Sequence, residues 1–373
     1  MGLSLVACGG ENSGPAVVHA AAGPEQSPKR AHAGASSTAN TNAASLPASA
    51  TDGEEGTPEP RGARFRGVNL SGADFTSSAL PGVEGRDYGW PTHAEVDYFA
   101  AKGVNTFRIG FLWERMQPKA YGSLTASYAA KLDDLVAYVT AHGANVILNP
   151  QNFARYYGHL VGSSAAPNAA FADFWRRIAT RYSASARVMF NLVNEPNGLP
   201  TEQWVGAANA AIAAIRSTGA TNLIHVPGNA WTGAHSWNDS WYGTSNAKAM
   251  LSIEDPADHF VYEVHAYLDA SAGGKTGDCV SKTIGSERLE GFLHWLRANK
   301  KKGFVGELAG GDNAVCDAAV TDMLTTIEAA TDVLEGWLWW GAGPRWSAGY
   351  PFALDPVDGK DAPQLALLAP FLD

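Results

Sequence analysis

The chain has 373 residues and a formal net charge of −10, from 27 Lys and Arg against 37 Asp and Glu. This acidic balance argues against a nucleic-acid-binding protein, because such proteins neutralise phosphates with a basic surface. The length fits two or three average domains, or one large α/β barrel. Nowhere does an apolar run reach the roughly 18 residues that a transmembrane helix needs.

Residues 1–10 and 11–60 are expected to lie outside the folded domain. Leu5-Val6-Ala7-Cys8 resembles a bacterial lipobox, in which small residues precede a Cys that becomes lipidated. The alternative is a truncated or wrongly assigned start with an accidental Cys. Residues 11–60 are rich in Ala, Ser, Thr, Gly and Pro without hydrophobic periodicity, which predicts a disordered linker. Lipid at Cys8 and a flexible tether would hold a folded domain at a membrane.

From residue 61 to 373 short apolar runs alternate with helical patterns. The predicted strands are Phe65–Leu70, Val104–Phe111, Ala144–Asn149, Val188–Val193, Asn222–Val226, Phe260–His265, Gly303–Gly306 and Gly336–Trp340. The predicted helices include His93–Ala101, Ser127–Ala141, Ala169–Tyr182, Glu202–Ser217, Ser286–Asn299 and Ala314–Ala329. Such alternation predicts a (β/α)8 TIM barrel in a single domain. A doubly wound sheet is the alternative, but no Gly-rich phosphate-binding motif follows the first strand.

Polar side chains gather where these strands end, which is where TIM barrels carry their active sites. In chain order they are Arg108, Asn149, Gln151, Asn152, Asn194, Glu195, Asn229, Trp231, His265, Tyr267, Glu307 and Trp340. Carboxylates are rarely buried without a reason. Glu195 and Glu307 each end an apolar strand, and in a closed barrel they should face each other across one site.

Two facing carboxylates suit the hydrolysis of a glycosidic bond. One of them must stay protonated to donate to the leaving oxygen, while the other must be ionised. A carboxyl beside another negative charge has a raised pKa, which keeps one acid protonated near neutral pH. The alternative for either acid alone is a salt bridge at the barrel end or a helix cap. The residues name the pair of acids but do not assign their roles.

These residues together resemble glycoside hydrolase family 5, and within it the subfamily of fungal endo-β-1,4-glucanases. The similarity spans residues 65–372. The motifs that carry it include Phe107-Arg108, Asn194-Glu195-Pro196, His265-Ala266-Tyr267, Gly306-Glu307-Leu308 and Trp339-Trp340-Gly341. The resemblance implies a retaining endoglucanase that cleaves β-1,4-glucan with two Glu residues. Mannan or xyloglucan remains an alternative substrate, and a transglycosylase shares the same chemistry.

The resemblance also implies a role for each site residue. Glu195 is the general acid/base and Glu307 the nucleophile. Asn194 holds the sugar's 2-hydroxyl, Tyr267 donates to the nucleophile, His265 orients the acid/base and Arg108 keeps Glu307 ionised. Trp340 forms the floor of the sugar site, with Trp339 in the core. Apart from the resemblance, the position of Trp231 after the fifth strand predicts that it lines the leaving-group side.

One departure from the family concerns the residues after the third strand. The family usually has His-Asn there, whereas this chain has Gln151-Asn152. Gln can still donate a hydrogen bond to a sugar hydroxyl, but it cannot carry charge. We expect an active enzyme; the alternative is a non-catalytic carbohydrate-binding barrel.

Besides Cys8, the chain has two further cysteines, Cys279 and Cys316. In an exported protein such a pair is typical of a disulfide, and the resembling subfamily has a matching pair; two unrelated buried thiols are the alternative. No metal-binding spacing such as C-x-x-C or H-E-x-x-H occurs. We therefore expect no metal or cofactor, a polysaccharide substrate, a monomer, and a secreted or cell-surface location.

Overall fold

The computed structural model describes residues 62–347 and 349–372. The predicted lipobox and linker lie outside these residues. Eight parallel strands close into a barrel in the order β1-β10-β9-β8-β7-β6-β3-β2. The barrel strands are β1 (Phe65–Leu70), β2 (Thr106–Phe111), β3 (Asn145–Pro150), β6 (Val188–Asn191), β7 (Ile224–Pro227), β8 (Phe260–Tyr267), β9 (Gly303–Ala309) and β10 (Leu334–Ala342). The predicted TIM barrel is confirmed.

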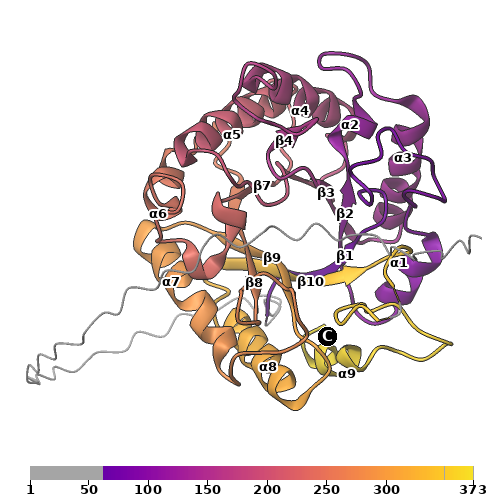
Figure 1. Ribbon diagram of the computed structural model, residues 1–373, viewed down its shortest axis with the longest axis vertical. Coiled ribbons are helices and arrows are strands. Elements are labelled where there is room, and N and C mark those ends of the chain that lie inside the picture. The colour runs from indigo at the N-terminus through magenta and orange to yellow at the C-terminus, as the bar shows by residue number, and fades with distance from the viewer. Residues whose placement is uncertain (1–61, 348, 373) are drawn as a thin grey trace, which may run out of the picture. The chain divides into compact units, whose positions relative to one another are not determined.

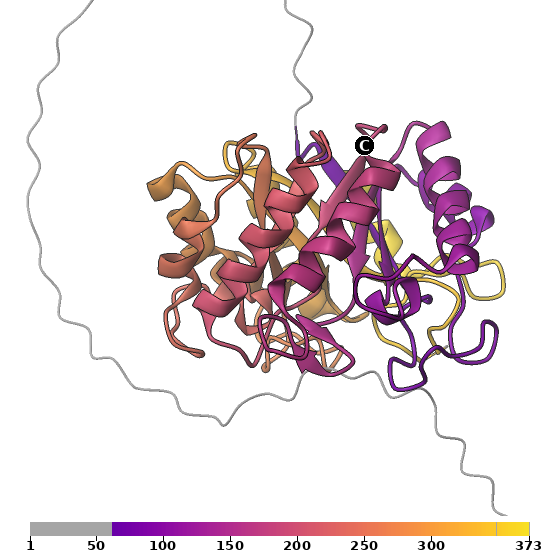
Figure 2. The same ribbon diagram turned by 90° about the horizontal axis from the view of Figure 1, so that it is seen from above.

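Helices surround the strands, as Figure 1 shows. They are α1 (His93–Ala100), α2 (Trp113–Met116), α3 (Ala126–Ala141), α4 (Asn168–Tyr182), α5 (Thr201–Arg216), α6 (Asn246–Ala249), α7 (Ile284–Asn299), α8 (Ala314–Glu328) and α9 (Pro363–Leu368). In both Figure 1 and Figure 2, α4 and α5 lie side by side on the outer wall. Among the described residues, none of the helices has the length and hydropathy needed to cross a membrane.

Local sequence signals set several of these boundaries. Thr92 and Glu95 form a reciprocal capping box at the start of α1, which satisfies two backbone donors that the helix leaves unpaired. The side chain of Asn313 accepts from the backbone N–H of Cys316 and caps α8. The short helices α2, α6 and α9 and the hairpin of β4 (Arg155–Tyr156) and β5 (His159–Leu160) were not among the predicted elements. Their length is too short for hydrophobic periodicity to reveal them.

The barrel interior changes from apolar to polar along its axis. An apolar layer fills its amino-terminal end and contains Phe65, Ile147, Met189, Leu223, Val261, Phe304 and Leu338. Side chains on a strand alternate between two faces, so every second residue beyond this layer also points inward. On β8 the inward series runs from Val261 through Glu263 and His265 to Tyr267. This alternation brings the polar residues together at the carboxyl-terminal end.

Candidate active site

Glu307 reaches the barrel interior because β9 is irregular. Val264 of β8 pairs with Val305, but the next residue, His265, pairs with Glu307 and skips Gly306. Such a bulge adds one residue to a strand and turns the following side chain to the other face. Glu307, which strict alternation from the inward-facing Phe304 would turn outward, therefore joins the polar interior and is only 3% exposed.

The carboxylate of Glu307 is held by two donors. Nη1 of Arg108 lies 2.8 Å from Oε1, and the hydroxyl of Tyr267 donates to Oε2 at 2.6 Å. Burial, followed by the charge of Glu307, raises the pKa of Tyr267 well above its usual value, so this hydroxyl remains a donor. Hydrogen bonds from a cation and a neutral hydroxyl favour the ionised carboxylate. This is the state that a nucleophile requires.

Glu195 follows β6 and occupies a different environment. Its backbone has φ of +44°, in the left-handed region that non-glycine residues seldom adopt. Its side chain is 16% exposed, against 3% for Glu307, and its Oε1 lies 2.7 Å from Nδ1 of His265. Burial raises the pKa of Glu195, and the nearby charge of Glu307 adds to this effect although His265 opposes it. The arrangement favours a proton on Glu195.

The two carboxyl groups lie close together. Glu195, His265 and Glu307 each offer one ligand atom within 4.8 Å of the others. Retaining glycosidases place their two carboxyl groups about 5–5.5 Å apart, whereas inverting enzymes leave room for a water molecule. A metal ion at these three groups would have to compete with Arg108 and Tyr267 for Glu307. The spacing therefore suits covalent catalysis at Glu307.

Arg108 organises the floor of the site from β2. Besides Glu307, Nη1 donates to Oδ1 of Asn69 at 2.7 Å, while Nη2 donates to Oδ1 of Asn194 at 2.8 Å. Nη2 also lies 3.2 Å from Oε1 of Glu263. The planar fork of Arg suits this set of acceptors, because its donors have fixed directions. The structure thus brings the predicted Arg108, Asn194 and Glu307 into one network.

Sequence reasoning did not identify Glu263 as a site residue, nor His225 as its partner. Both side chains are fully buried, and Nδ1 of His225 lies 3.0 Å from Oε2 of Glu263. Asn191 donates to the other oxygen. The signal was present in the strand sequence Phe260–Tyr267, where Glu263, His265 and Tyr267 recur at every second position.

The side chains of Gln151 and Asn152, which follow β3, form hydrogen bonds to neighbouring residues. Oε1 of Gln151 accepts from Asn149, and the backbone N–H of Gln151 donates to Phe111. The side chain of Asn152 accepts from the backbone of Trp113 and donates to Glu114 at 2.6 Å. These contacts use the amide of Asn152 to fix the loop after β3.

The aromatic residues of the site differ in exposure. Trp340 is 6% exposed and donates to the hydroxyl of Tyr350 at 2.8 Å, whereas Trp339 is fully buried, as predicted. Trp231 has a backbone N–H bond to Pro196, next to the acid Glu195. Its ring lies 6.1 Å from that of Trp241, which is half exposed. Trp231 and Trp241 therefore form an aromatic pair, anchored through Trp231 to the residue that follows Glu195.

Cys279 and Cys316 form the predicted disulfide, 37 residues apart. The bond ties the segment after β8 to the first turn of α8. This segment contains Asp269, whose carboxylate accepts from the backbone N–H groups of Gly273, Gly274 and Lys275. The crosslink thus secures the chain between Tyr267 and α7.

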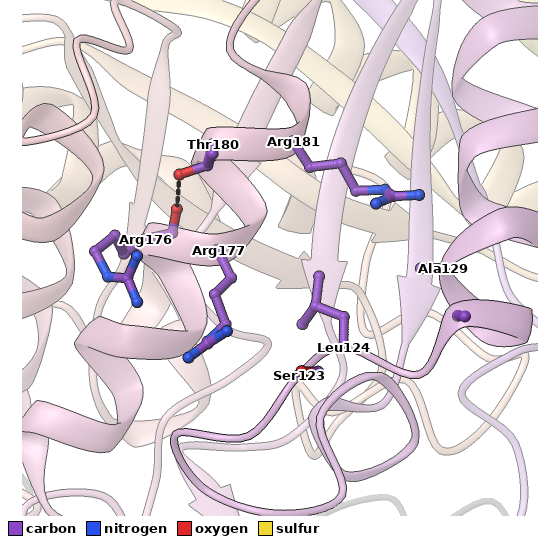
Figure 3. Close-up of a pocket in the computed structure, with 8 residues that line it drawn as sticks. Ser123, Leu124, Ala129, Arg176, Arg177, Thr180 and Arg181 are labelled. Carbon is purple, nitrogen blue, oxygen red and sulfur yellow. Dashed lines mark hydrogen bonds between the residues drawn. The ribbon is translucent and has the colours of Figure 1, made fainter.

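A cavity of about 410 Å³ lies elsewhere, on the outer wall between α4 and the start of α3. Figure 3 shows the arginine residues Arg176, Arg177 and Arg181 that line it from α4. Arg176 and Arg177 pair with Asp173, and Arg181 pairs with Asp133. Because these cations are already neutralised, the cavity has no unpaired charge for an anion and is separate from the site of the two acids.

Comparisons with known proteins agree with this geometry. The pattern described as "Cellulase (glycosyl hydrolase family 5)" matches residues 66–343. Endo-β-1,4-glucanase B of Emericella nidulans is 40% identical over 299 residues, which covers 80% of this chain and 88% of that protein. Another match is an endo-β-1,4-glucanase structure from Xanthomonas axonopodis pv. citri, with a TM-score of 0.82 and 47% identity, covering 83% of this chain and 98% of that one. XacCel5A, solved in complex with cellopentaose, is 45% identical with a TM-score of 0.82 and covers 83% of this chain and 99% of that chain. Together with the paired acids at the strand ends, these matches show that the chain belongs to the cellulase family known as glycosyl hydrolase family 5.

Proposed function

We propose that the chain is a retaining endo-β-1,4-glucanase acting on cellulose and cello-oligosaccharides by double displacement. The observation that carries the proposal is the close approach of Glu195 and Glu307 in unequal environments. Relatives with 40–47% identity are endo-β-1,4-glucanases, and one was solved with cellopentaose. Because both acids are present and offer oxygen atoms within 4.8 Å of each other, the structure favours catalysis over a binding-only barrel.

In the first step an oxygen of Glu307 attacks the anomeric carbon of the sugar. The glycosidic C–O bond breaks, and Glu195 gives its proton to the leaving oxygen. In the second step Glu195 takes a proton from water, whose oxygen attacks the same carbon and releases the Glu307 carboxylate. The greater exposure of Glu195 suits this exchange with water.

The neighbouring side chains support both steps. Arg108 and Tyr267 stabilise the ionised Glu307 before attack and after release. Arg108 occupies Oδ1 of Asn194, so the amide presents its Nδ2 donors to the sugar's 2-hydroxyl. Trp340 offers an aromatic face to the reacting sugar, and Trp231 to the leaving group.

The function is tested with a chain that starts near Arg61, incubated with carboxymethylcellulose, barley β-glucan, xyloglucan and glucomannan. We expect reducing ends and short oligomers from the β-1,4-glucans, and none from a Glu307→Gln variant. Faster release from glucomannan or xyloglucan than from cellulose derivatives would instead assign a mannanase or xyloglucanase. Retained polysaccharide binding without any release would support the binding-only barrel.

We also propose that the enzyme works outside the cytoplasm, anchored through Cys8. The Cys279–Cys316 disulfide supports an oxidising compartment, where such bonds persist. A polymeric substrate is likewise met outside the cell. Metabolic labelling with a fatty acid should mark the full chain but not a Cys8→Ala variant; equal labelling of the two would refute the anchor.

A further inference from the structure

A third carboxylate, Glu263, lies beneath the two catalytic acids. It belongs to β8, and its side chain is fully buried. Its Oε1 lies 3.2 Å from Nη2 of Arg108, and its Oε2 lies 3.0 Å from Nδ1 of His225. Asn191 donates a further hydrogen bond to Oε1. A buried carboxylate is costly unless it is paired in this way, so its presence calls for a reason.

The backbone of β9 is shaped around this carboxylate. A Cβ atom at Gly306 would come within 2.5 Å of Cδ of Glu263, so only glycine fits opposite it. Gly306 is also the residue that the register between β8 and β9 skips. The irregularity that makes space for Glu263 is therefore the one that turns Glu307 into the site.

His265 lies between Glu263 and the catalytic pair. Its Nδ1 is 2.7 Å from Oε1 of Glu195 and 3.2 Å from Oε2 of Glu307. On the other side, Nε2 is 3.5 Å from Oε1 of Glu263 and makes no standard hydrogen bond within the described residues. Because both ring nitrogens face carboxylates, both are favoured to carry a proton.

The charges that face Glu263 come from every neighbouring strand. Arg108 on β2, His225 on β7 and His265 on β8 contact the carboxylate itself. Glu307 on β9 and Glu195 after β6 lie behind them, in contact with Arg108 or His265. The carboxylates of Glu263 and Glu307 both pair with Arg108, and both face the ring of His265. Without Glu263 the positive charge on His265 would lack its second anionic partner.

We propose that Glu263 is a positioning residue that stays ionised and holds His265 as an imidazolium against Glu195 and Glu307. Glu263 also fixes the guanidinium of Arg108, which binds the nucleophile Glu307. The inference rests on the proposed roles of Glu195 and Glu307. Because the carboxylate is fully buried, it acts only through these two side chains.

The electrostatics of the cluster agree with this assignment. Burial would raise the pKa of Glu263, but Arg108, His225 and His265 hold it well below its usual value. Burial would lower the pKa of His265, but Glu307, Glu195 and Glu263 together raise it to about 9. An imidazolium at neutral pH is therefore a consequence of the three acids around it.

The test follows the protonation of His265 directly by NMR of protein carrying 13C-labelled histidine. Its ring signal is identified by its absence from a His265→Gln variant. We expect His265 in the unchanged enzyme to remain protonated at pH 7.5 and to titrate near pH 9. In Glu263→Gln the midpoint should fall by at least about one pH unit, whereas Glu263→Asp, which keeps the charge, should restore part of the shift.

A matched control is Asp255→Asn. Asp255 is also a fully buried, ion-paired carboxylate, 2.7 Å from Arg216, but it does not contact His265. The Asp255→Asn substitution should lower the free energy of unfolding without moving the midpoint of the His265 titration. A neutral His265 at pH 7.5 in the unchanged enzyme would overturn the proposal even if Glu263→Gln does not fold, as would an unshifted midpoint in a folded Glu263→Gln. Because the NMR readout uses no substrate, its outcome is independent of which polysaccharide the enzyme cleaves.

Discussion

Replacing Glu195 by Gln removes the proton donor while leaving its contacts in place. The amide oxygen of Gln can accept from Nδ1 of His265, as Oε1 of Glu195 does at 2.7 Å. Burial raises the pKa of Glu195, so the folded chain already favours an uncharged group at this position. A carboxyl whose folded-state pKa is raised contributes less stability as the pH increases. The unfolding temperature of Glu195→Gln should therefore equal or exceed that of the unchanged enzyme at neutral pH.

The kinetic cost of Glu195→Gln should depend on the leaving group. A general acid contributes about 100- to 10,000-fold, which corresponds to about 3–5 kcal/mol of activation free energy. With carboxymethylcellulose or cellopentaose, whose leaving group is an alcohol, kcat/KM should fall by this amount. With dinitrophenyl β-cellobioside the leaving group departs without a proton, so kcat/KM should stay within about tenfold.

The matched comparison is Glu307→Gln, which removes the nucleophile and should abolish activity on both substrates. Initial rates by reducing-end release and by dinitrophenolate absorbance measure the two reactions. Equal losses of kcat/KM on both substrates in Glu195→Gln would refute its role as general acid. Retained activity of Glu307→Gln on the activated substrate would reverse the two assignments.

Three further predictions concern other parts of the barrel. Gln151→His should leave kcat/KM on cello-oligosaccharides unchanged or raise it, because the imidazole adds a donor that can carry charge; a large loss would show that the bond between Asn149 and Gln151 is needed. Replacing both Cys279 and Cys316 by Ser should lower the free energy of unfolding by about 3–4 kcal/mol, measured by calorimetry. Added reductant should then have no further effect on the stability of this variant. Burial raises the pKa of Asp355 to about 6, although its bond from Gly343 opposes this. The unfolded value lies near 3.8, so this carboxyl lowers stability as the pH rises from about 4 to 6. The unfolding temperature of Asp355→Asn should therefore equal that of the unchanged enzyme at pH 4 and be higher at pH 7. A lower unfolding temperature of the variant at pH 7 would contradict the raised pKa.

The sequence was sufficient to predict the barrel and the two acids for a simple physical reason. Parallel strands covered on both faces are continuous apolar runs, and their carboxyl ends meet at one edge. A polar residue that ends such a run, as Glu195 and Glu307 do, therefore points to the site. The observed strands β8 and β9 extend beyond the predicted ranges, because their polar inward-facing residues, Glu263, His265 and Glu307, interrupt the apolar pattern. Strand β10 is also longer than predicted, by two residues at each end.

The orientation of the site residues was harder to predict. Strict alternation from Phe304 would turn Glu307 out of the barrel, and only the register shift at Gly306 brings it inward. The left-handed backbone of Glu195 likewise depends on the fold around it, since its side chain does not favour that conformation. Glu263 was missed because the residues that hydrogen-bond to it are far away in sequence. Arg108 and His225 reach it from β2 and β7.

The polar interior of this barrel therefore serves packing and chemistry with the same residues. Arg108 neutralises Glu263 in the buried layer and binds Glu307 in the reacting layer, so one guanidinium joins the two. Gly306 gives space to Glu263 and, through the register shift, directs Glu307. Because breaking a buried ion pair costs about 3–5 kcal/mol, substitutions in this layer should change stability and pH dependence together. Substitutions at the exposed Trp241 should instead change substrate binding alone, because its ring lies outside the ion-paired cluster.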